Sequence, residues 1–235
     1  MSAAEDEDTL TGDFGSMIRS NPRTVWDPRT GDNWLWRVNY RRLRGRGPSS
    51  TERLVGADGV LQLTVAYGSR VAVKGLLFQA KKSWDRDPRL PEQCAKLKPW
   101  EQAAVLFDYR PHKYDVFTLD QVQRSNGLRK MAGPPVSMPE LLSNVFLACK
   151  RGAFGLYYHP FNRELFWPTS RGLVRVPFKV KHQATIEVGY ESLDDNLFPQ
   201  VPALEAPQDY FMEFPLIQAQ GEPYPENLYY SQQTR

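Results

Sequence analysis

The stretch that decides the fold is residues 57–81, ADGVLQLTVAYGSRVAVKGLLFQAK. Apolar and polar residues alternate over about 58–67, and a second apolar-rich run covers about 70–81, so the pattern predicts two β-strands. Gly68 and Ser69 stand between them and suit a two-residue hairpin loop that begins with glycine. The stretch therefore predicts a β-hairpin.

The hairpin register brings three polar side chains together. If Tyr67 pairs with Arg70 across the loop, counting back along both strands places Asp58 opposite Gln79. Lys81 lies two residues beyond Gln79 and points to the same face. A carboxylate, an amide and an ammonium group thus share the open end of the hairpin. This set suits phosphodiester hydrolysis, because carboxylate and amide oxygens bind hard divalent cations and a lysine can act on water or phosphate.

The residues around this cluster resemble a known nuclease superfamily. The stretch 52–59, ERLVGADG, and the later stretch 77–81, LFQAK, are similar to the PD-(D/E)xK restriction-endonuclease-like fold. The similarity is greatest to its Mrr-like branch, in which glutamine replaces the second acid, and it covers roughly residues 40–160. Ala57 stands where the family has proline. The resemblance implies an α/β fold with a mixed central sheet flanked by helices, here followed by extra C-terminal strands.

The resemblance also implies a role for each site residue. Asp58, Gln79 and the backbone carbonyl of Ala80 correspond to the metal ligands, and Lys81 corresponds to the catalytic lysine. Glu52 corresponds to the helix glutamate of many members, as a catalytic or metal-binding residue, although a charge at the start of a helix explains it equally well. The implied cofactor is Mg²⁺, with Mn²⁺ as a substitute.

The implied activity is that of a metal-dependent endonuclease that hydrolyses phosphodiester bonds in DNA. Members of the superfamily often serve in prokaryotic defence against foreign DNA, so the resemblance implies an anti-phage effector, acting as a homodimer or as a subunit of a larger defence complex. The alternative is a non-catalytic protein that keeps the nuclease fold as a scaffold or as a nucleic-acid-binding subunit and docks a partner. Asp58 beside two glycines is also compatible with a simple turn.

Basic residues near the hairpin suggest where a nucleic acid binds. The net charge of +3 is too small to indicate DNA binding by itself. A local group of basic side chains could contact phosphates, although a solvated basic face explains it almost as well. The group consists of Arg41, Arg42, Arg44, Arg46 and Lys82.

Composition divides the chain into three parts. Residues 1–15 are acidic and small and are predicted to be disordered. Residues 16–194 are expected to form the nuclease domain that the resemblance implies, and residues 195–235 are expected to form an arm or tail rich in Pro, Gln and Tyr. The two cysteines form no Cys-x-x-Cys pair and the three histidines are scattered, which argues against a zinc site or a disulfide framework. With no long apolar run, the sequence predicts a cytoplasmic protein without a membrane span.

The remaining elements follow from local signals. A short helix is expected from Pro91 to just before Pro99, and the apolar run 103–107 predicts a strand covered on both faces. Ser137 and Glu140 fit a capping box at the start of a helix over about 138–150. Further strands are expected at 153–158, 164–167, 173–180 and 184–189.

Overall fold

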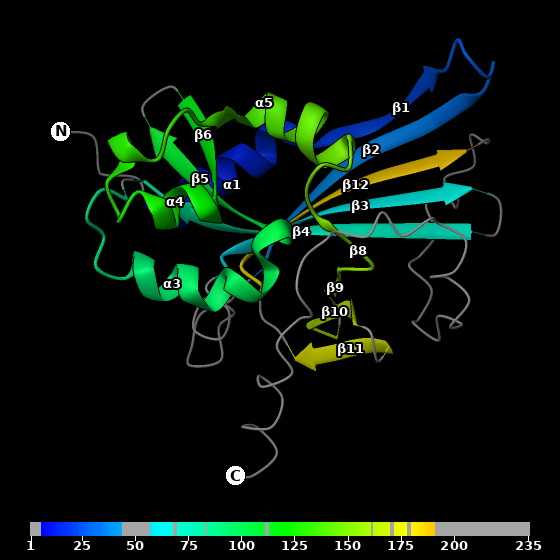
Figure 1. Ribbon diagram of the computed structural model, residues 1–235. Coiled ribbons are helices and arrows are strands. Elements are labelled where there is room, and N and C mark those ends of the chain that lie inside the picture. The colour runs from blue at the N-terminus through cyan, green and yellow to red at the C-terminus, as the bar shows by residue number, and fades with distance from the viewer. Residues whose placement is uncertain are drawn as a thin grey trace.

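The structure is a computed structural model in which the chain adopts an α/β fold with a mixed central sheet flanked by helices (Figure 1). Glu52, Arg44, Arg46 and the segment 195–235, for which the sequence predicts roles, lie outside the described residues. The description covers residues 6–43, 57–67, 70–82, 84–110, 113–160, 162–169, 172–177 and 180–190.

The main sheet has nine strands in the described part of the chain. Their order is β1-β2-β12-β3-β4-β5-β6-β7, and β8 pairs with β4 in addition. The pairs β12–β3 and β4–β5 are parallel, whereas the other pairs are antiparallel. The strands are β1 (Ser20–Trp26), β2 (Asn33–Arg42), β3 (Gly59–Tyr67), β4 (Arg70–Lys81), β5 (Ala104–Arg110), β6 (Lys113–Thr118), β7 (Val136–Ser137), β8 (Ala153–Phe154) and β12 (His182–Tyr190).

The predicted hairpin register is confirmed. Tyr67 pairs with Arg70 at one end of β3 and β4, and Gly59 pairs with Phe78 at the other. The backbone N–H of Asp58 donates to the carbonyl of Phe78 at 2.8 Å, which extends the pairing beyond β3. The strand expected at 103–107 is β5, and its continuous apolar sequence is explained by burial on both faces of the sheet.

Apolar side chains alternate between the two faces of the sheet and form one buried cluster on each. Helix α1 (Glu7–Ile18) covers one face, and helices α3 (Leu90–Leu97) and α4 (Leu119–Arg124) cover the other (Figure 1). The cluster beneath α1 includes Phe14, Leu61, Phe78 and Phe107. The cluster beneath α3 and α4 includes Val60, Leu77, Cys94, Leu106 and Leu119.

Helix α1 corrects the prediction of a disordered N-terminus, because residues 7–15 are helical. Asp6 caps the helix by accepting a hydrogen bond from the backbone N–H of Thr9 at 2.8 Å. The acidic residues that suggested disorder therefore form the first turn, where negative charge favours a helix. Phe14 anchors α1 in the core of the sheet.

The predicted helix over 138–150 is shorter and less regular than expected. Ser137 caps it as predicted, since its side chain accepts from the backbone N–H of Glu140 at 3.3 Å. The segment then forms α5 (Met138–Glu140) and the π-helical η3 (Leu141–Leu147). The helix expected from Pro91 to before Pro99 is α3. The described residues also include the short 3-10 helices η1 (Lys98–Ala103) and η2 (Arg129–Met131).

The C-terminal strands divide between two sheets. Strands β9 (Tyr157–His159), β10 (Glu164–Thr169) and β11 (Gly172–Pro177) form a small antiparallel sheet. The last described strand, β12, instead enters the main sheet between β2 and β3. This insertion brings the residues just before β12 to the start of β3.

Gly75 provides a test of packing in the middle of β4. A Cβ atom there would lie 2.6 Å from the carbonyl oxygen of Leu156 and 2.9 Å from its side chain. We expect Gly75→Ala to lower the free energy of unfolding by about 1–3 kcal/mol, because Leu156 directly precedes β9 and its backbone cannot withdraw without moving that strand. Chemical denaturation measures this change. Gly189→Ala is the matched control, since its Cβ would contact nothing within 4 Å. Equal stabilities of the two variants would contradict the prediction.

Candidate active site

The site lies where three neighbouring strands of the main sheet meet at one edge. Asp58 directly precedes β3, Gln79 and Lys81 end β4, and Lys181 directly precedes β12. Because β3 is antiparallel to β4 and parallel to β12, these strand ends lie side by side. The structure therefore brings together the three residues that the hairpin register predicts, and it adds Lys181.

Asp58 lies at the centre of a hydrogen-bond network, and only 5% of the whole residue is exposed. Its Oδ2 accepts from the backbone N–H of Ala80 at 2.9 Å and from the side-chain amide of Gln79. Its Oδ1 accepts from the ammonium of Lys181 at 2.7 Å. The carboxylate is thus held by two neutral donors on one side and faces a cation on the other.

The nitrogen and the oxygen of the Gln79 side-chain amide differ in their hydrogen bonding to the described residues. Its Nε2 donates to Asp58 and lies 3.3 Å from the carbonyl oxygen of Ala80. Its Oε1 is buried and accepts no hydrogen bond from the residues that the structure describes. A buried amide oxygen normally has a partner. This oxygen, the Asp58 carboxylate and the Ala80 carbonyl are the hard donors that Mg²⁺ prefers, and they fit such an ion once the Gln79 amide turns its oxygen, in place of its nitrogen, toward Asp58 and Ala80.

Lys81 is completely buried, and its ammonium lies 2.9 Å from the carboxylate of Asp87. Burial opposes ionisation of Asp87, yet the hydrogen bond from Lys81 lowers the pKa of that carboxyl. The Asp87 carboxyl is also held by the backbone N–H of Arg89 at 2.9 Å. In this conformation Lys81 faces a protein carboxylate, and motion of the segment carrying Asp87 would be needed to expose it.

Glu7 is a further residue at the candidate site, and the sequence-based prediction does not include it. It stands in the first turn of α1, and its Oε1 accepts from the backbone N–H of Lys82 at 3.2 Å. Burial raises the pKa of Glu7, while the charge of Lys81 opposes this rise and the charge of Asp58 adds to it. The helix-start pattern beginning at Asp6 was the available signal. A helix glutamate beside the cluster thus comes from α1, whereas Glu52 lies outside the described residues.

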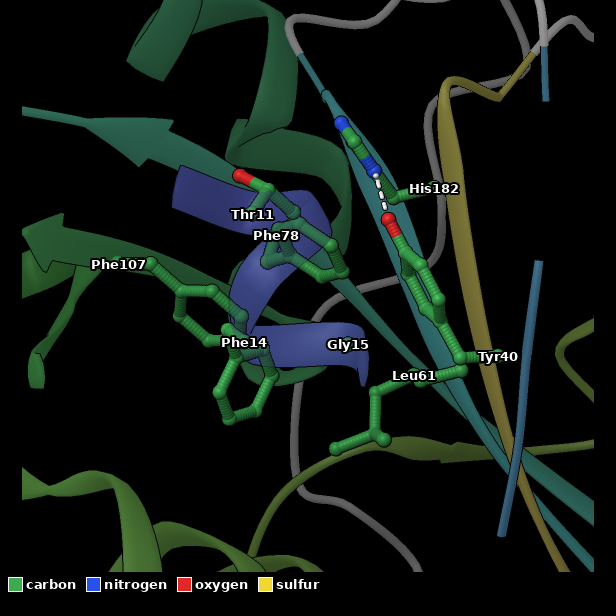
Figure 2. Close-up of a pocket in the computed structure, with 9 residues that line it drawn as sticks. Thr11, Phe14, Gly15, Tyr40, Leu61, Phe78, Phe107 and His182 are labelled. Atoms are coloured by element: carbon green, nitrogen blue, oxygen red, sulfur yellow. Dashed lines mark hydrogen bonds between the residues drawn. The ribbon is translucent and has the colours of Figure 1, made fainter. Parts of the chain in front are cut away.

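Asp8 fixes the N-terminal turn of α1 to the sheet. It forms an ion pair with Arg42 on β2 and lies 2.8 Å from Nε2 of His182 on β12. The other ring nitrogen of His182 hydrogen-bonds with the hydroxyl of Tyr40 at 2.7 Å (Figure 2). Burial lowers the pKa of His182 to about 4, against the influence of Asp8. A neutral imidazole at this position therefore links α1 to β2 and β12.

The other residues predicted to bind nucleic acid have separate positions. Arg41 and Arg42 are exposed neighbours on β2 and point to opposite faces of the sheet, so they do not form one continuous surface. The guanidinium of Arg42 pairs with Asp8. Lys82 is exposed at the end of β4, next to the site.

A buried acid pair lies beside Lys81 and is neutralised by arginine. Asp108 pairs with Lys81 in the parallel register of β4 and β5, and Asp115 faces it from β6. The guanidinium of Arg129 donates to Asp108 at 2.5 Å and to Asp115 at 3.0 Å. Burial raises the pKa of Asp108, with Arg129 opposing the rise. These carboxylates serve as counter-ions for Arg129, so we do not include them among the candidate metal ligands.

An apolar pocket lies on the opposite face of the sheet, between α1 and the strands. Two of its polar groups are paired with each other, since Tyr40 hydrogen-bonds with His182 (Figure 2), and the hydroxyl of Thr11 hydrogen-bonds with that of Tyr109 at 2.9 Å. The pocket is a gap in packing beneath α1 and offers no free donor set. Its walls are formed by Thr11, Phe14, Gly15, Tyr40, Leu61, Phe78, Phe107, His182 and Ala184.

Comparisons with known proteins assign no family to the chain. No protein-family model matches it, and neither the curated proteins nor the solved structures include a significant match. Within the described residues, no group of three or more His, Cys, Asp or Glu side chains could hold a metal ion. In the same residues, no helix is long and apolar enough to cross a membrane. Any functional assignment must therefore come from the geometry of the site.

Proposed function

We propose that this protein is a divalent-metal-dependent nuclease of restriction-endonuclease-like fold that hydrolyses phosphodiester bonds in DNA. The observation that carries the proposal is the contact between Asp58 and Gln79, which leaves the buried Oε1 of Gln79 without a hydrogen-bond partner among the described residues. Asp58, Gln79 and the Ala80 carbonyl would hold Mg²⁺ or Mn²⁺. When bound, such an ion polarises a phosphate and lowers the pKa of its water.

The protein side chains then have distinct tasks. The backbone N–H of Ala80 orients Asp58 by binding Oδ2, so that Oδ1 faces away from the strand pair. Lys81 supplies positive charge for the phosphate, or orients the attacking water, once it separates from Asp87. Glu7 supplies a second carboxyl near Lys81 and can accept a proton from water, because its raised pKa makes it a better base than an ordinary carboxylate.

The alternative function is a non-catalytic scaffold or nucleic-acid-binding subunit. The observation that favours it is the complete burial of Lys81 against Asp87, because a catalytic lysine must reach its substrate. A plasmid-cleavage assay separates the two functions. A nuclease cuts the plasmid with Mg²⁺ or Mn²⁺ and stops when EDTA is added. A scaffold cuts under none of these conditions, and that result would reject the proposed activity.

Substitutions of Gln79 test its role as a ligand. We expect Gln79→Leu to weaken Mg²⁺ binding and cleavage by about 10- to 100-fold, because leucine has similar bulk but no donor oxygen. Gln79→Glu should retain or tighten metal binding, and the metal should raise its melting temperature more than that of the parent. Without metal this variant places two carboxylates together and loses the donor to Asp58.

Calorimetry and plasmid cleavage measure the two effects separately. Gln123→Leu is the matched control, because that amide accepts from the exposed ammonium of Lys98 and lies on α4, which carries none of the site residues. It should bind metal and cut DNA like the parent. If Gln79→Leu also behaves like the parent in both assays, the glutamine is structural and the ligand set is wrong.

A further inference from the structure

We propose that Lys181 is an exchangeable counter-ion of the active site. It neutralises Asp58 while no divalent cation is bound, and it leaves the carboxylate to contact a phosphate of the nucleic acid when a cation binds there. This inference rests on the proposed function and deepens it. It assigns a role to a residue that lies outside the hairpin and outside every motif of the sequence.

The position of Lys181 is fixed at its backbone. The carbonyl oxygen of Asp58 accepts from the backbone N–H of Lys181 at 3.1 Å and from that of His182 at 3.2 Å. The start of β12 is therefore tied to the residue that its side chain also contacts. A lysine with a fixed backbone can still move its ammonium over several ångströms, because four rotatable bonds separate the two.

The two oxygens of Asp58 differ in what holds them. Oδ2 is bound by the backbone of Ala80 and the amide of Gln79, which both belong to the strand pair. Oδ1 is bound by the ammonium of Lys181 at 2.7 Å. A divalent cation that approaches Asp58 from the Oδ1 side needs the place that this ammonium occupies. Two cations cannot share it, because their mutual repulsion is strong in a partly desolvated site.

Exposure distinguishes Lys181 from Lys81. The Lys81 side chain is 0% exposed and its partner Asp87 is 12% exposed, so that pair is enclosed. The Lys181 side chain is 24% exposed, whereas the side chain of its partner Asp58 is 7% exposed. Lys181 therefore approaches a buried carboxylate from the solvent side. A side chain in this position can withdraw into solvent without unpacking the core, and its charge then lies at the mouth of the site, where a phosphate would arrive.

The test compares charge-removing and charge-keeping variants of the full chain. We expect Lys181→Met to bind Mn²⁺ about tenfold tighter than the parent, because no cation must be displaced from Oδ1. Lys181→Arg should bind Mn²⁺ like the parent. DNA binding is measured in Ca²⁺, so that the measurement does not depend on turnover. Under these conditions Lys181→Met should bind a DNA duplex several-fold more weakly than the parent and with a smaller salt dependence.

Lys98→Met is the matched control, because Lys98 also lies 2.7 Å from a carboxylate, that of Glu101, but on the surface of η1. It should leave Mn²⁺ affinity unchanged. Lys181→Gln, which can still donate to Asp58, replaces the methionine variant if the latter does not fold. Calorimetry measures Mn²⁺ affinity, and fluorescence anisotropy measures DNA affinity.

The outcomes separate this inference from the proposed function. Tighter Mn²⁺ binding with weaker DNA binding supports the exchange. Parental Mn²⁺ affinity in Lys181→Met, with measurable binding in both proteins, overturns the exchange but leaves the metal site intact. Unchanged DNA affinity of Lys181→Met likewise overturns the exchange but leaves the metal site intact. If neither the parent nor the variant binds Mn²⁺, both the metal-dependent function and the exchange are rejected.

Discussion

Replacing Asp58 with asparagine is expected to reduce metal-dependent DNA cleavage by about a thousandfold, because the site loses its charged metal ligand and several kcal/mol of transition-state stabilisation. Asparagine keeps the shape of the side chain and an oxygen that can accept from the backbone of Ala80. The loss of activity should therefore exceed any loss of folding. Plasmid cleavage in Mg²⁺, beside thermal unfolding of the same preparation, measures both quantities.

Alanine at position 58 is a less suitable test than asparagine. The sequence places Asp58 at the start of a strand, and this position predicts that Asp58→Ala leaves folding nearly intact. The structure shows that Asp58 is buried and binds Ala80, Gln79 and Lys181, so truncation leaves buried donors unpaired and costs about 1–3 kcal/mol. Asp120→Asn, at an exposed ion pair with Arg124 on α4, is the control for losing one carboxylate. Parental cleavage by Asp58→Asn would exclude this metal site.

Replacing Lys81 with methionine is expected to lower the rate of cleavage by about 100- to 1000-fold while metal affinity stays close to that of the parent. The cation is lost but the oxygen ligands of Asp58, Gln79 and Ala80 remain. The variant should also lose about 2 kcal/mol of stability, because Asp87 loses its buried partner. Single-turnover cleavage, calorimetry and chemical denaturation measure the three effects.

A double variant distinguishes catalysis by Lys81 from a structural role. Lys81→Met combined with Asp87→Asn removes both charges of the pair, so much of the lost stability should return. Cleavage should stay low, because the cation at the site is still missing. If the double variant regains both stability and cleavage, Lys81 serves only to neutralise Asp87, and the scaffold interpretation gains support.

The core of the candidate site could be predicted because it depends on contacts within one hairpin. The alternation of side chains along a strand and the length of the loop together determine which residues face each other. Asp58, Gln79 and Lys81 lie within 24 residues of sequence, and the register that joins β3 and β4 is the one that the sequence predicts. Local signals likewise predicted α3, β5 and the cap at Ser137.

The prediction of a disordered N-terminus, which was based on amino-acid composition, was wrong for the residues of α1. Acidic residues are common both in disordered segments and in the first turn of helices, where they complement the helix dipole. The choice depends on whether the helix can bury an apolar face. Phe14 does so against the sheet, and Asp8 adds contacts to Arg42 and His182. These partners lie far away in sequence, so the acidic pattern alone could not reveal that α1 carries Glu7 into the site.

By itself, the sequence determined the hairpin and the shared face of Asp58, Gln79 and Lys81, because turn length and strand alternation are local properties. Only the tertiary structure decided which other charges meet them. Strand β12 lies parallel to β3, which places Lys181 on Asp58 across 123 residues of sequence, and α1 places Glu7 at Lys82 across 75 residues. Pairing over such separations depends on which sheet edges and apolar faces remain available after the local elements have formed. Side-chain periodicity along one strand does not predict which distant strand will pair with it.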